Sequence, residues 1–271
     1  METEESSFVS GRTRIFGIVG DPIERVRSPE MFSAEFVRRG LEALMIPIHV
    51  LPADFAACIA QLKRVQNLDG LVFTVPYKQA AIGLADTLGP QARTVGAINA
   101  LVRQPDGVWM GDMFDGLGCV AAFQWRCYPL LGQRLTLIGA GSAGSAIGVA
   151  LAHENPRSIR LHDRDQARAD DLAAKIRSIN PAIEVTTGEP LIRDIDILLN
   201  ASPVGMLSDP RMPVDISAIS PDIIVFDAIV KPERTHLLAL AQERGCRTIT
   251  GREMIRGQMF RLADFFSGRA T

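Results

Sequence analysis

The stretch that most constrains the fold is LTLIGAGSAGSAIGVALAH, residues 135–153. An apolar run typical of a buried strand leads into Gly139, Gly141 and Gly144, which form a GxGxxG pattern at the opening of an apolar helix. There the glycines permit a tight turn, close approach of the backbone to pyrophosphate, and close packing of helix on strand. The helix N-terminus favours the phosphates. We therefore predict a dinucleotide site that includes Ser142 and Ala143. The alternative is a tight turn that binds no ligand.

The residues after the next expected strand bear on the choice of cofactor. Asp163 follows residues 159–162, nineteen positions after Gly144. A carboxylate there bonds the hydroxyls of an adenosine ribose and repels a 2′-phosphate, which favours NAD over NADP. Arg164 and Arg168 oppose that preference, because either guanidinium would pair with the phosphate. NAD is the favoured cofactor and NADP stays open. Asp163 has the alternative role of capping a turn.

Strands and helices alternate along almost the whole chain, which predicts an α/β fold with parallel sheets covered by helices. At 271 residues, 47% of them hydrophobic, the chain is long enough for two domains. In the first part we expect strands at 15–20, 44–51 and 70–75, a hairpin of 98–103 with 108–110, and helices from 28, at 54–65 and at 79–88. In the second part we expect strands at 134–138, 159–162, 183–187, 195–200, 223–227 and 247–250, and helices at 116–128, 142–153, 166–179, 235–244 and 254–266.

Composition excludes several classes of partner. The formal charge is −2, from 29 Lys and Arg against 31 Asp and Glu, so the chain carries no electrostatic footprint for nucleic acid or an anionic membrane. No segment has the uninterrupted apolar length that spans a bilayer, and the N-terminus lacks an apolar leader, so we expect a cytoplasmic protein. The four cysteines and four histidines lack metal-ligand spacing, and we expect no metal. The expected partner is a small molecule, and the chain is expected to be a monomer or a homodimer.

A lysine and an aspartate are the candidates for proton transfer. The strand in LVFTVPYKQA ends at Pro76, which leaves Lys78 at the carboxyl end of a strand, where open α/β sheets bind ligands. Asp115, in WMGDMFDGLG, opens the helix that connects the two parts, and Asp112 lies close by. A lysine and a carboxylate that share one substrate hydroxyl would suit an oxidoreductase, since the lysine passes the proton. The alternative for each is a solvated or capping side chain.

Eight stretches together resemble the motifs of the shikimate and quinate dehydrogenases, in order and over nearly the whole chain. They are GDPIERVRSPEMFSAEF, FTVPYKQAA, GAIN, GDMFDGLG, LIGAGSAG, NASPVGM, FDAIVKPERTHLL and GREMIRGQMF. The resemblance implies a substrate-binding and catalytic domain at 1–115, a Rossmann NAD(P)-binding domain at 116–250, and a C-terminal helix in 251–271 that packs back on the substrate domain. It implies an active site in the cleft between the domains.

The same resemblance assigns roles to individual residues. Lys78 and Asp115 match the catalytic pair. The substrate-binding positions are Asn99 and Gln258 for hydroxyls, Ser28 for the carboxylate, and Thr74 in the pocket. Ser202 and Val204, in NASPVGM, match the cofactor-binding part of the second domain.

Four departures from the family pattern predict a changed substrate. Val26 stands where the family has the first of two carboxylate-binding serines, Phe73 is taken as the counterpart of an asparagine, Met113-Phe114 replaces Asn-Thr, and Val230 replaces a tyrosine. An unpaired polar group costs about 1–3 kcal/mol. Either Arg25 or Arg27 replaces the missing serine, or both are solvated loop charges.

These observations predict an NAD(P)-dependent dehydrogenase that acts on a ring hydroxyl of shikimate, quinate or a related, less polar cyclic hydroxy acid. Shikimate itself is expected to be a poor substrate. Two alternatives stay open: a nucleotide- or metabolite-binding regulator that has lost catalysis, and an oxidoreductase with the same Rossmann signature but an unrelated substrate.

Overall fold

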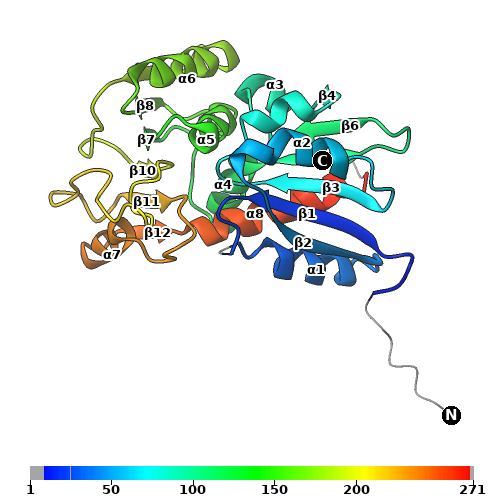
Figure 1. Cartoon of the computed structure of the whole chain (residues 1–271). Helices are drawn as coiled ribbons and strands as arrows, with labels where there is room; N and C mark the ends of the chain where they lie inside the picture. The colour runs from blue at the N-terminus through cyan, green and yellow to red at the C-terminus, as the bar shows by residue number, and fades with distance from the viewer. Residues whose placement is uncertain (1–8, 25, 269–271) are drawn as a thin grey trace. The chain divides into compact units, whose positions relative to one another are not determined.

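A computed structural model describes residues 9–24 and 26–268 and shows a mixed α/β chain with two six-stranded sheets (Figure 1). The chain divides into two compact units. The first comprises Met1–Met113 with Leu262–Thr271, and the second is the uninterrupted segment Phe114–Arg261. The second unit is therefore an insertion in the sequence of the first.

The first unit is built on a mixed sheet of order β2-β1-β3-β5-β6-β4. Its strands are β1 Arg14–Gly20, β2 Ala43–His49, β3 Leu68–Phe73, β4 Thr87–Leu88, β5 Ala100–Arg103 and β6 Trp109–Asp112. β1 pairs in parallel with β2 and β3, and the β5–β6 hairpin is antiparallel to β3. Its helices are α1 Ser28–Arg38, η1 Pro52–Asp54, α2 Phe55–Leu62, η2 Ala80–Leu84 and α3 Pro90–Val95.

Aromatic side chains cover both faces of this sheet. On one face Tyr77 stacks on Phe55 with ring centroids 4.1 Å apart, and both are buried in the main core of the unit. On the other face Phe16 lies 4.8 Å from Phe36 of α1 and 4.8 Å from Phe266. Because both faces are buried, the strands read as apolar runs rather than as an alternating pattern.

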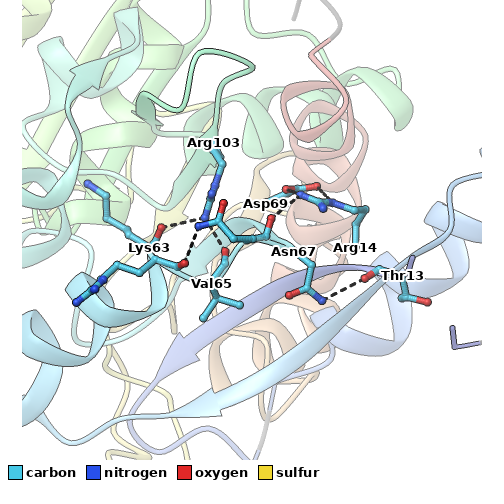
Figure 2. A network of polar contacts seen from close by, with 9 residues as sticks. Thr13, Arg14, Lys63, Val65, Asn67, Asp69 and Arg103 are labelled. Atoms are coloured by element: carbon cyan, nitrogen blue, oxygen red, sulfur yellow. Dashed lines mark hydrogen bonds and ion pairs between the residues drawn. The ribbon is translucent and has the colours of Figure 1, made fainter. Parts of the chain in front are cut away.

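Two arginines hold the edge of the sheet where β1 and β3 begin. Figure 2 shows Arg103, at the end of β5, donating from Nη2 to the carbonyls of Lys63 and Val65 at 2.9 and 2.6 Å. Arg14 pairs with Asp69 through Nε at 2.6 Å. Lys63 terminates α2, so Arg103 places a cation where the helix leaves its last carbonyls unpaired. These bonds stabilise the edge of the sheet where β1 and β3 begin.

The second unit is built on a parallel sheet of order β12-β11-β10-β7-β8-β9. Its strands are β7 Arg134–Ile138, β8 Ser158–His162, β9 Glu184–Thr187, β10 Ile197–Asn200, β11 Ile224–Asp227 and β12 Arg247–Ile249. Its helices are α4 Asp115–Trp125, α5 Ser142–Ala152, α6 Gln166–Ile179, α7 His236–Glu243 and α8 Gly251–Phe266, of which the last five residues belong to the first unit. The strand order reverses between β7 and β10, which defines a topological switch point.

Glycines allow the helices of the second unit to pack closely. A Cβ added to Gly116 of α4 would lie 2.0 Å from the carbonyl oxygen of Ala146 in α5. A Cβ added to Gly118 would lie 2.6 Å from the carbonyl oxygen of Met254 in α8, and one added to Gly257 would lie 2.5 Å from that of Gly118. These distances exclude a side chain at each position, so the glycines fix how α4 crosses its two neighbours.

Most of the predicted elements are confirmed. The strand predicted at 134–138 and the helix predicted at 166–179 have the same bounds as β7 and α6, and the predicted hairpin corresponds to β5–β6. The helix predicted at 79–88 is wrong: the chain forms only the short 3₁₀ turn η2, then β4 and α3. The helix predicted at 54–65 is shorter, with α2 ending at Leu62. Among the described residues, no helix has the length and apolar character needed to cross a bilayer.

The division of the chain into two compact units does not show which unit binds the substrate. The functional division into 1–115, 116–250 and 251–271 therefore stays a prediction.

Candidate active site

The glycine loop after β7 has the conformation that the sequence predicts. Gly139 has φ +96° and donates its N–H to the carbonyl of His162 at 2.7 Å. A Cβ on Gly139 would lie 2.7 Å from the backbone nitrogen of Ser202, and one on Gly144 would lie 1.9 Å from the carbonyl oxygen of Gly139. A Cβ on Gly141 would meet nothing within 4 Å. The first glycine makes the turn, the third permits the helix to pack, and the second leaves its backbone open to a ligand.

The N-terminus of α5 follows directly on this loop. Gly141 is the N-cap and provides no side-chain cap, and Ser142 and Ala143 are only half-buried. The first backbone N–H groups of a helix have no partner within the helix, and the helix dipole favours an anion there. The predicted residues thus form a cradle that fits the pyrophosphate of a dinucleotide.

Asp163 holds the glycine loop rather than projecting freely from it. Its Oδ2 accepts from the N–H of Ala140 at 2.7 Å, and its Oδ1 accepts from the N–H of Asp165 at 2.9 Å. Arg164 and Arg168 are exposed, and Arg168 Nε lies 3.3 Å from Asp165 Oδ2. The alternative that Asp163 caps a turn is therefore present in the structure, whereas the expected contact with ribose hydroxyls stays a prediction.

The turn after β10 forms the other side of the switch point. The side chain of Asn200 accepts from Ser202 Oγ at 2.7 Å and donates to the carbonyl of Val204 at 3.1 Å. Ser202 Oγ in turn accepts from the N–H of Val204 at 3.3 Å. Because Gly139 packs against Ala201 and Ser202, this turn lies directly beside the glycine loop. Ser202 thus lies beside the glycine loop, and the role of Ser202 and Val204 in cofactor binding stays a prediction.

A buried polar cluster next to this turn was missed by the sequence reasoning. Asp227, at the end of β11, is fully buried and accepts from Asn200, Thr235 and the N–H of Ile229. Burial raises the pKa of Asp227 to about 6, and these hydrogen bonds oppose the rise. A polar residue that ends an apolar strand, as in FDAI, is the signal that would have found it.

In the first unit, three predicted residues lie together at the carboxyl edge of the sheet. Thr74 follows β3 and donates its N–H to the carbonyl of Val19 at 3.0 Å. The carbonyl of Lys78 accepts from the N–H of Ile98 at 3.0 Å, and the carbonyl of Asn99 accepts from the N–H of Phe73 at 2.8 Å. The FTVPYK and GAIN segments are therefore tied together by their backbones, with Asn99 buried and Thr74 and Lys78 half-buried.

The loop after β1 carries the candidates for carboxylate binding. Ser28 is the first residue of α1 and is half-buried, and the side chain of Val26 is half-buried as well. Arg27 is exposed and pairs with Glu30 at 2.9 Å. Arg25 lies outside the described residues, so its compensating role stays a prediction, as does that of Arg27.

The interpretation of Phe73 as a changed pocket residue is wrong. Phe73 is buried in the core, 5.8 Å from Phe55 in an edge-to-face arrangement. Counting back six residues from Lys78 along Asn-Val-Thr-Val-Pro-Phe-Lys places the asparagine at Val72 instead. In the resemblance, the residue that stands for the asparagine is therefore Val72.

Asp115 and Gln258 both lie in the second unit. Asp115 is the first residue of α4, where the helix dipole favours a carboxylate, and it is buried. The close crossing at Gly118 brings α8 against α4, because a Cβ on Gly118 would lie 2.9 Å from Cβ of Gln258. Lys78 belongs to the first unit, so the approach of Lys78 to Asp115 stays a prediction.

Asp112, close to Asp115 in the sequence, has a structural role. Its Oδ1 accepts from the N–H of Ala92 at 2.7 Å and from that of Met113 at 2.9 Å, which satisfies the N-terminus of α3. Burial raises the pKa of Asp112, although the backbone hydrogen bonds oppose the rise. A Cβ on Gly89 would lie 2.2 Å from Asp112 Oδ2, so this carboxylate occupies space that a side chain would need.

The parallel sheet of the second unit, with a glycine loop and an uncapped helix N-terminus at its switch point, defines a dinucleotide-binding protein. In the other unit, the backbone of Lys78 is hydrogen-bonded to that of Ile98, next to Asn99. A dinucleotide-binding unit combined with a second α/β unit is the arrangement expected of a two-domain oxidoreductase.

Comparison with known proteins identifies the family. The model for the shikimate dehydrogenase substrate binding domain matches residues 18–101, and the model for shikimate / quinate 5-dehydrogenase matches residues 124–205. A shikimate dehydrogenase (NADP(+)) from Cereibacter sphaeroides is 32% identical over 246 residues, which are 90% of this chain and 88% of the relative. The chain belongs to the shikimate/quinate dehydrogenase family of NAD(P)-dependent oxidoreductases.

Two solved structures show the same architecture. The 5-ketofructose reductase of Gluconobacter sp. strain CHM43, in a ligand-free form, is 28% identical with a TM-score of 0.83, over 96% of this chain and 95% of that one. Shikimate 5-dehydrogenase from Listeria monocytogenes, in complex with shikimate and NAD, is 27% identical with a TM-score of 0.85, over 100% and 96%. The predicted fold class is confirmed.

Proposed function

We propose that this protein transfers hydride reversibly between a nicotinamide cofactor and a ring hydroxyl of a cyclic hydroxy acid less polar than shikimate or quinate. The observation that carries the proposal is the carboxyl edge of the first sheet. There the backbones of Lys78 and Asn99 are tied into one arrangement with Thr74, whereas Val26 and Val72 replace polar groups of the family pattern.

In this proposal the first unit holds the substrate and the second holds the cofactor. The nicotinamide, when bound, accepts or donates the hydride. Lys78 and Asp115 hold the substrate hydroxyl between them, and Lys78 takes its proton as the alcohol becomes a ketone. Thr74, Asn99 and Gln258 orient the ring, and Ser28 binds its acidic group.

The apolar replacements set the substrate class. A pocket built for hydroxyls rejects analogues that lack them, because its own polar groups are then left unpaired. Replacing such groups by valine removes that penalty and leaves a substrate hydroxyl unpaired instead, at a cost of about 1–3 kcal/mol. Val72 therefore favours a substrate with fewer hydroxyls, whereas Val26 removes a partner of the acidic group.

Val26 also favours a second candidate function. With one carboxylate-binding serine absent, the pocket has a weaker requirement for an acid, and the 5-ketofructose reductase with the same architecture acts, by its name, on a ketosugar. A reductase of uncharged polyhydroxy ketones would use the same Lys78 and Asp115.

For the cofactor we propose NADP(H) in preference to NAD(H). Asp163 was the reason to expect NAD, but both of its oxygens accept backbone N–H groups. Arg164 and Arg168 are exposed cations suited to a 2′-phosphate, and Arg168 would exchange its pairing with Asp165 for the phosphate. The Cereibacter relative is named for NADP(+), although the Listeria structure contains NAD.

A single assay separates these possibilities. Absorbance at 340 nm would be followed with NAD(H) and NADP(H) for shikimate, quinate, deoxygenated analogues and 5-ketofructose, with Lys78→Ala as the control. A deoxygenated acid as the best substrate supports the first proposal, and 5-ketofructose as the best substrate supports the second. Shikimate turned over best, at the efficiency of an ordinary dehydrogenase, would contradict both. Cofactor binding without turnover of any substrate would favour a regulator that has lost catalysis.

A further inference from the structure

Asp227 occupies a position in the second unit that the proposed chemistry does not use. Its carboxylate has no exposed surface and accepts three hydrogen bonds. Oδ1 accepts from Asn200 Nδ2 at 3.1 Å and from the N–H of Ile229 at 3.0 Å, and Oδ2 accepts from Thr235 Oγ1 at 2.7 Å. An ionised group buried this completely is costly, so its retention calls for a reason.

Each oxygen of Asp227 fixes a different segment. Through Asn200, Oδ1 fixes the turn that carries Ser202 and Val204. Through Thr235, Oδ2 fixes the far end of segment 228–235, because Thr235 also caps α7 by accepting from the N–H of Leu238. One carboxylate therefore connects the segments that follow β10 and β11.

The strand order indicates which half of a bound dinucleotide the segments after β10 and β11 would contact. In a doubly wound sheet the two halves on either side of the switch point each bind one half of the dinucleotide. β7, β8 and β9 form the half that begins with the glycine loop and includes Asp163, which is the adenosine half. β10, β11 and β12 form the other half, so Asn200 and Asp227 end the strands on the nicotinamide side.

We propose that Asp227 is a positioning residue that holds the segments after β10 and β11 in the arrangement needed to bind the nicotinamide end of the cofactor. The inference rests on the proposed function for the identity of the ligand. An asparagine at this position keeps an oxygen that can accept from Asn200 and Ile229, but it places an NH2 group against Thr235 Oγ1, where the carboxylate accepts the hydroxyl proton, so it cannot reproduce the whole arrangement.

The same geometry makes nicotinamide binding depend on pH. The groups that face the carboxylate are neutral: the amide of Asn200, the hydroxyl of Thr235 and the N–H of Ile229, and within the described residues no charged side chain contributes to the shift of its pKa. Because burial raises the pKa of Asp227 to about 6, a proton enters the cluster in mildly acidic solution. That proton replaces an acceptor with a donor, so nicotinamide binding should weaken below about pH 6.

The test compares two ligands that differ only in the nicotinamide. NADPH binding is followed by its fluorescence, and ADP-ribose 2′-phosphate, which lacks the nicotinamide, is measured by competition; NADH and ADP-ribose serve if the protein prefers NAD. We expect Asp227→Asn to weaken binding of the reduced cofactor about tenfold, the loss typical of a disrupted buried hydrogen-bond network, and to leave the ADP-ribose ligand almost unchanged. Equal effects on the two ligands, or no effect on either, would overturn the inference.

Asp196→Asn is the matched control. Asp196 precedes the opposite end of β10 and accepts from the backbone N–H of Arg134 at 2.8 Å and from its Nη2 at 2.9 Å, so the control removes comparable bonds from the same sheet. It should change neither ligand's affinity. If Asp227→Asn does not fold, two variants of Thr235 provide the test. Thr235→Val should weaken binding of the reduced cofactor but not of the ADP-ribose ligand, whereas Thr235→Ser should bind both as the wild type does. Identical affinities of the two variants would count against the inference. Wild-type protein that binds neither ligand would overturn the inference together with the proposed function.

Discussion

Lys78 is the residue on which the proposed chemistry depends most directly. We expect Lys78→Ala to lower kcat about 10²- to 10⁴-fold, the usual contribution of a positioned acid or base, with little change in cofactor affinity. Steady-state kinetics on the best substrate of the panel would measure it. Lys63→Ala is the control, because Lys63 in the same unit bonds the carbonyl of Leu84 at 2.9 Å and faces no proposed substrate. Unchanged kcat in Lys78→Ala would remove this residue from the mechanism.

Asp227 should also make stability depend on pH. Its ordinary pKa of 3.8 is raised to about 6 by burial, so between these values the folded chain keeps a proton that the unfolded chain has lost. The stabilising contribution of this carboxyl is complete below about pH 4 and is lost as the pH rises through 6. A shift of this size corresponds to about 3 kcal/mol in the free energy of unfolding.

Denaturant unfolding of the wild type and Asp227→Asn across pH 4–7 would isolate this effect, since the other titrating groups are common to both proteins. Relative to the wild type, the variant should gain stability by about that amount as the pH rises. A difference that does not vary with pH would show that the carboxyl does not titrate in this range.

The residues that follow strands show which features of the candidate site could be predicted from the sequence alone and which could not. The positions of Thr74, Lys78 and Gly139 after strands could be predicted because each strand is recognisable in the sequence, whereas the roles of these residues stay predictions. For Asp163 the capping alternative is visible, since its carboxylate accepts from the backbone N–H groups of Ala140 and Asp165, and contact with ribose stays a prediction. Asp227 itself could have been noticed as a polar residue that ends the apolar strand in FDAI, but its partners Asn200 and Thr235 could not be predicted, because they come from separate segments.

At the scale of elements, the loop and helix at the switch point make a paired prediction. Gly144→Ala should lower both cofactor affinity and the free energy of unfolding, the latter by about 1–3 kcal/mol, because its Cβ would overlap the carbonyl oxygen of Gly139. Gly141→Ala should lower cofactor affinity alone, because its Cβ meets open space that the ligand would fill. Thermal unfolding and cofactor titration of the two variants would separate these effects. Equal losses of stability would contradict the assignment of roles.

Elements of strong local pattern were predicted, and those that depend on distant residues were not. The helix α6 has apolar residues at helical spacing and a capping Asp165, all visible in the sequence. The six-residue helix α3 instead depends on Asp112 of β6, which bonds the N–H of Ala92 from twenty residues away. A short helix held by a tertiary contact leaves no periodic signal, so the segment 79–95 was misassigned.

At the scale of the molecule, Phe266 ties the end of α8 into the first unit. It lies 4.8 Å from Phe16 and 6.2 Å from Phe32, and Gly70 leaves room for its ring. We expect Phe266→Ala to lower the free energy of unfolding by about 3–5 kcal/mol, as for other buried aromatic residues. Phe260→Ala, on the same helix but half-buried, should cost less in the same denaturant titration. Equal costs would contradict the role assigned to Phe266.

The architecture of the whole chain was predictable because alternating strands and helices permit few topologies. The sequence placed the connecting helix at 116–128, and α4 begins at Asp115. What pattern alone could not show is that α8 is shared, with its residues to Arg261 in the second unit and those from Leu262 in the first. Membership of a compact unit is set by packing, and periodicity within a helix carries no information about it.

That division has a consequence for biosynthesis. A ribosome releases residues in order, so the strands of the first unit emerge before any part of the second. Yet the aromatic core between β1 and α1 lacks Phe266 until residues beyond Arg261 have been translated. All residues of the second unit have been translated before the last residues of the first unit, which supply its final packing contacts. The unit whose translation begins first is therefore the one whose core is completed last.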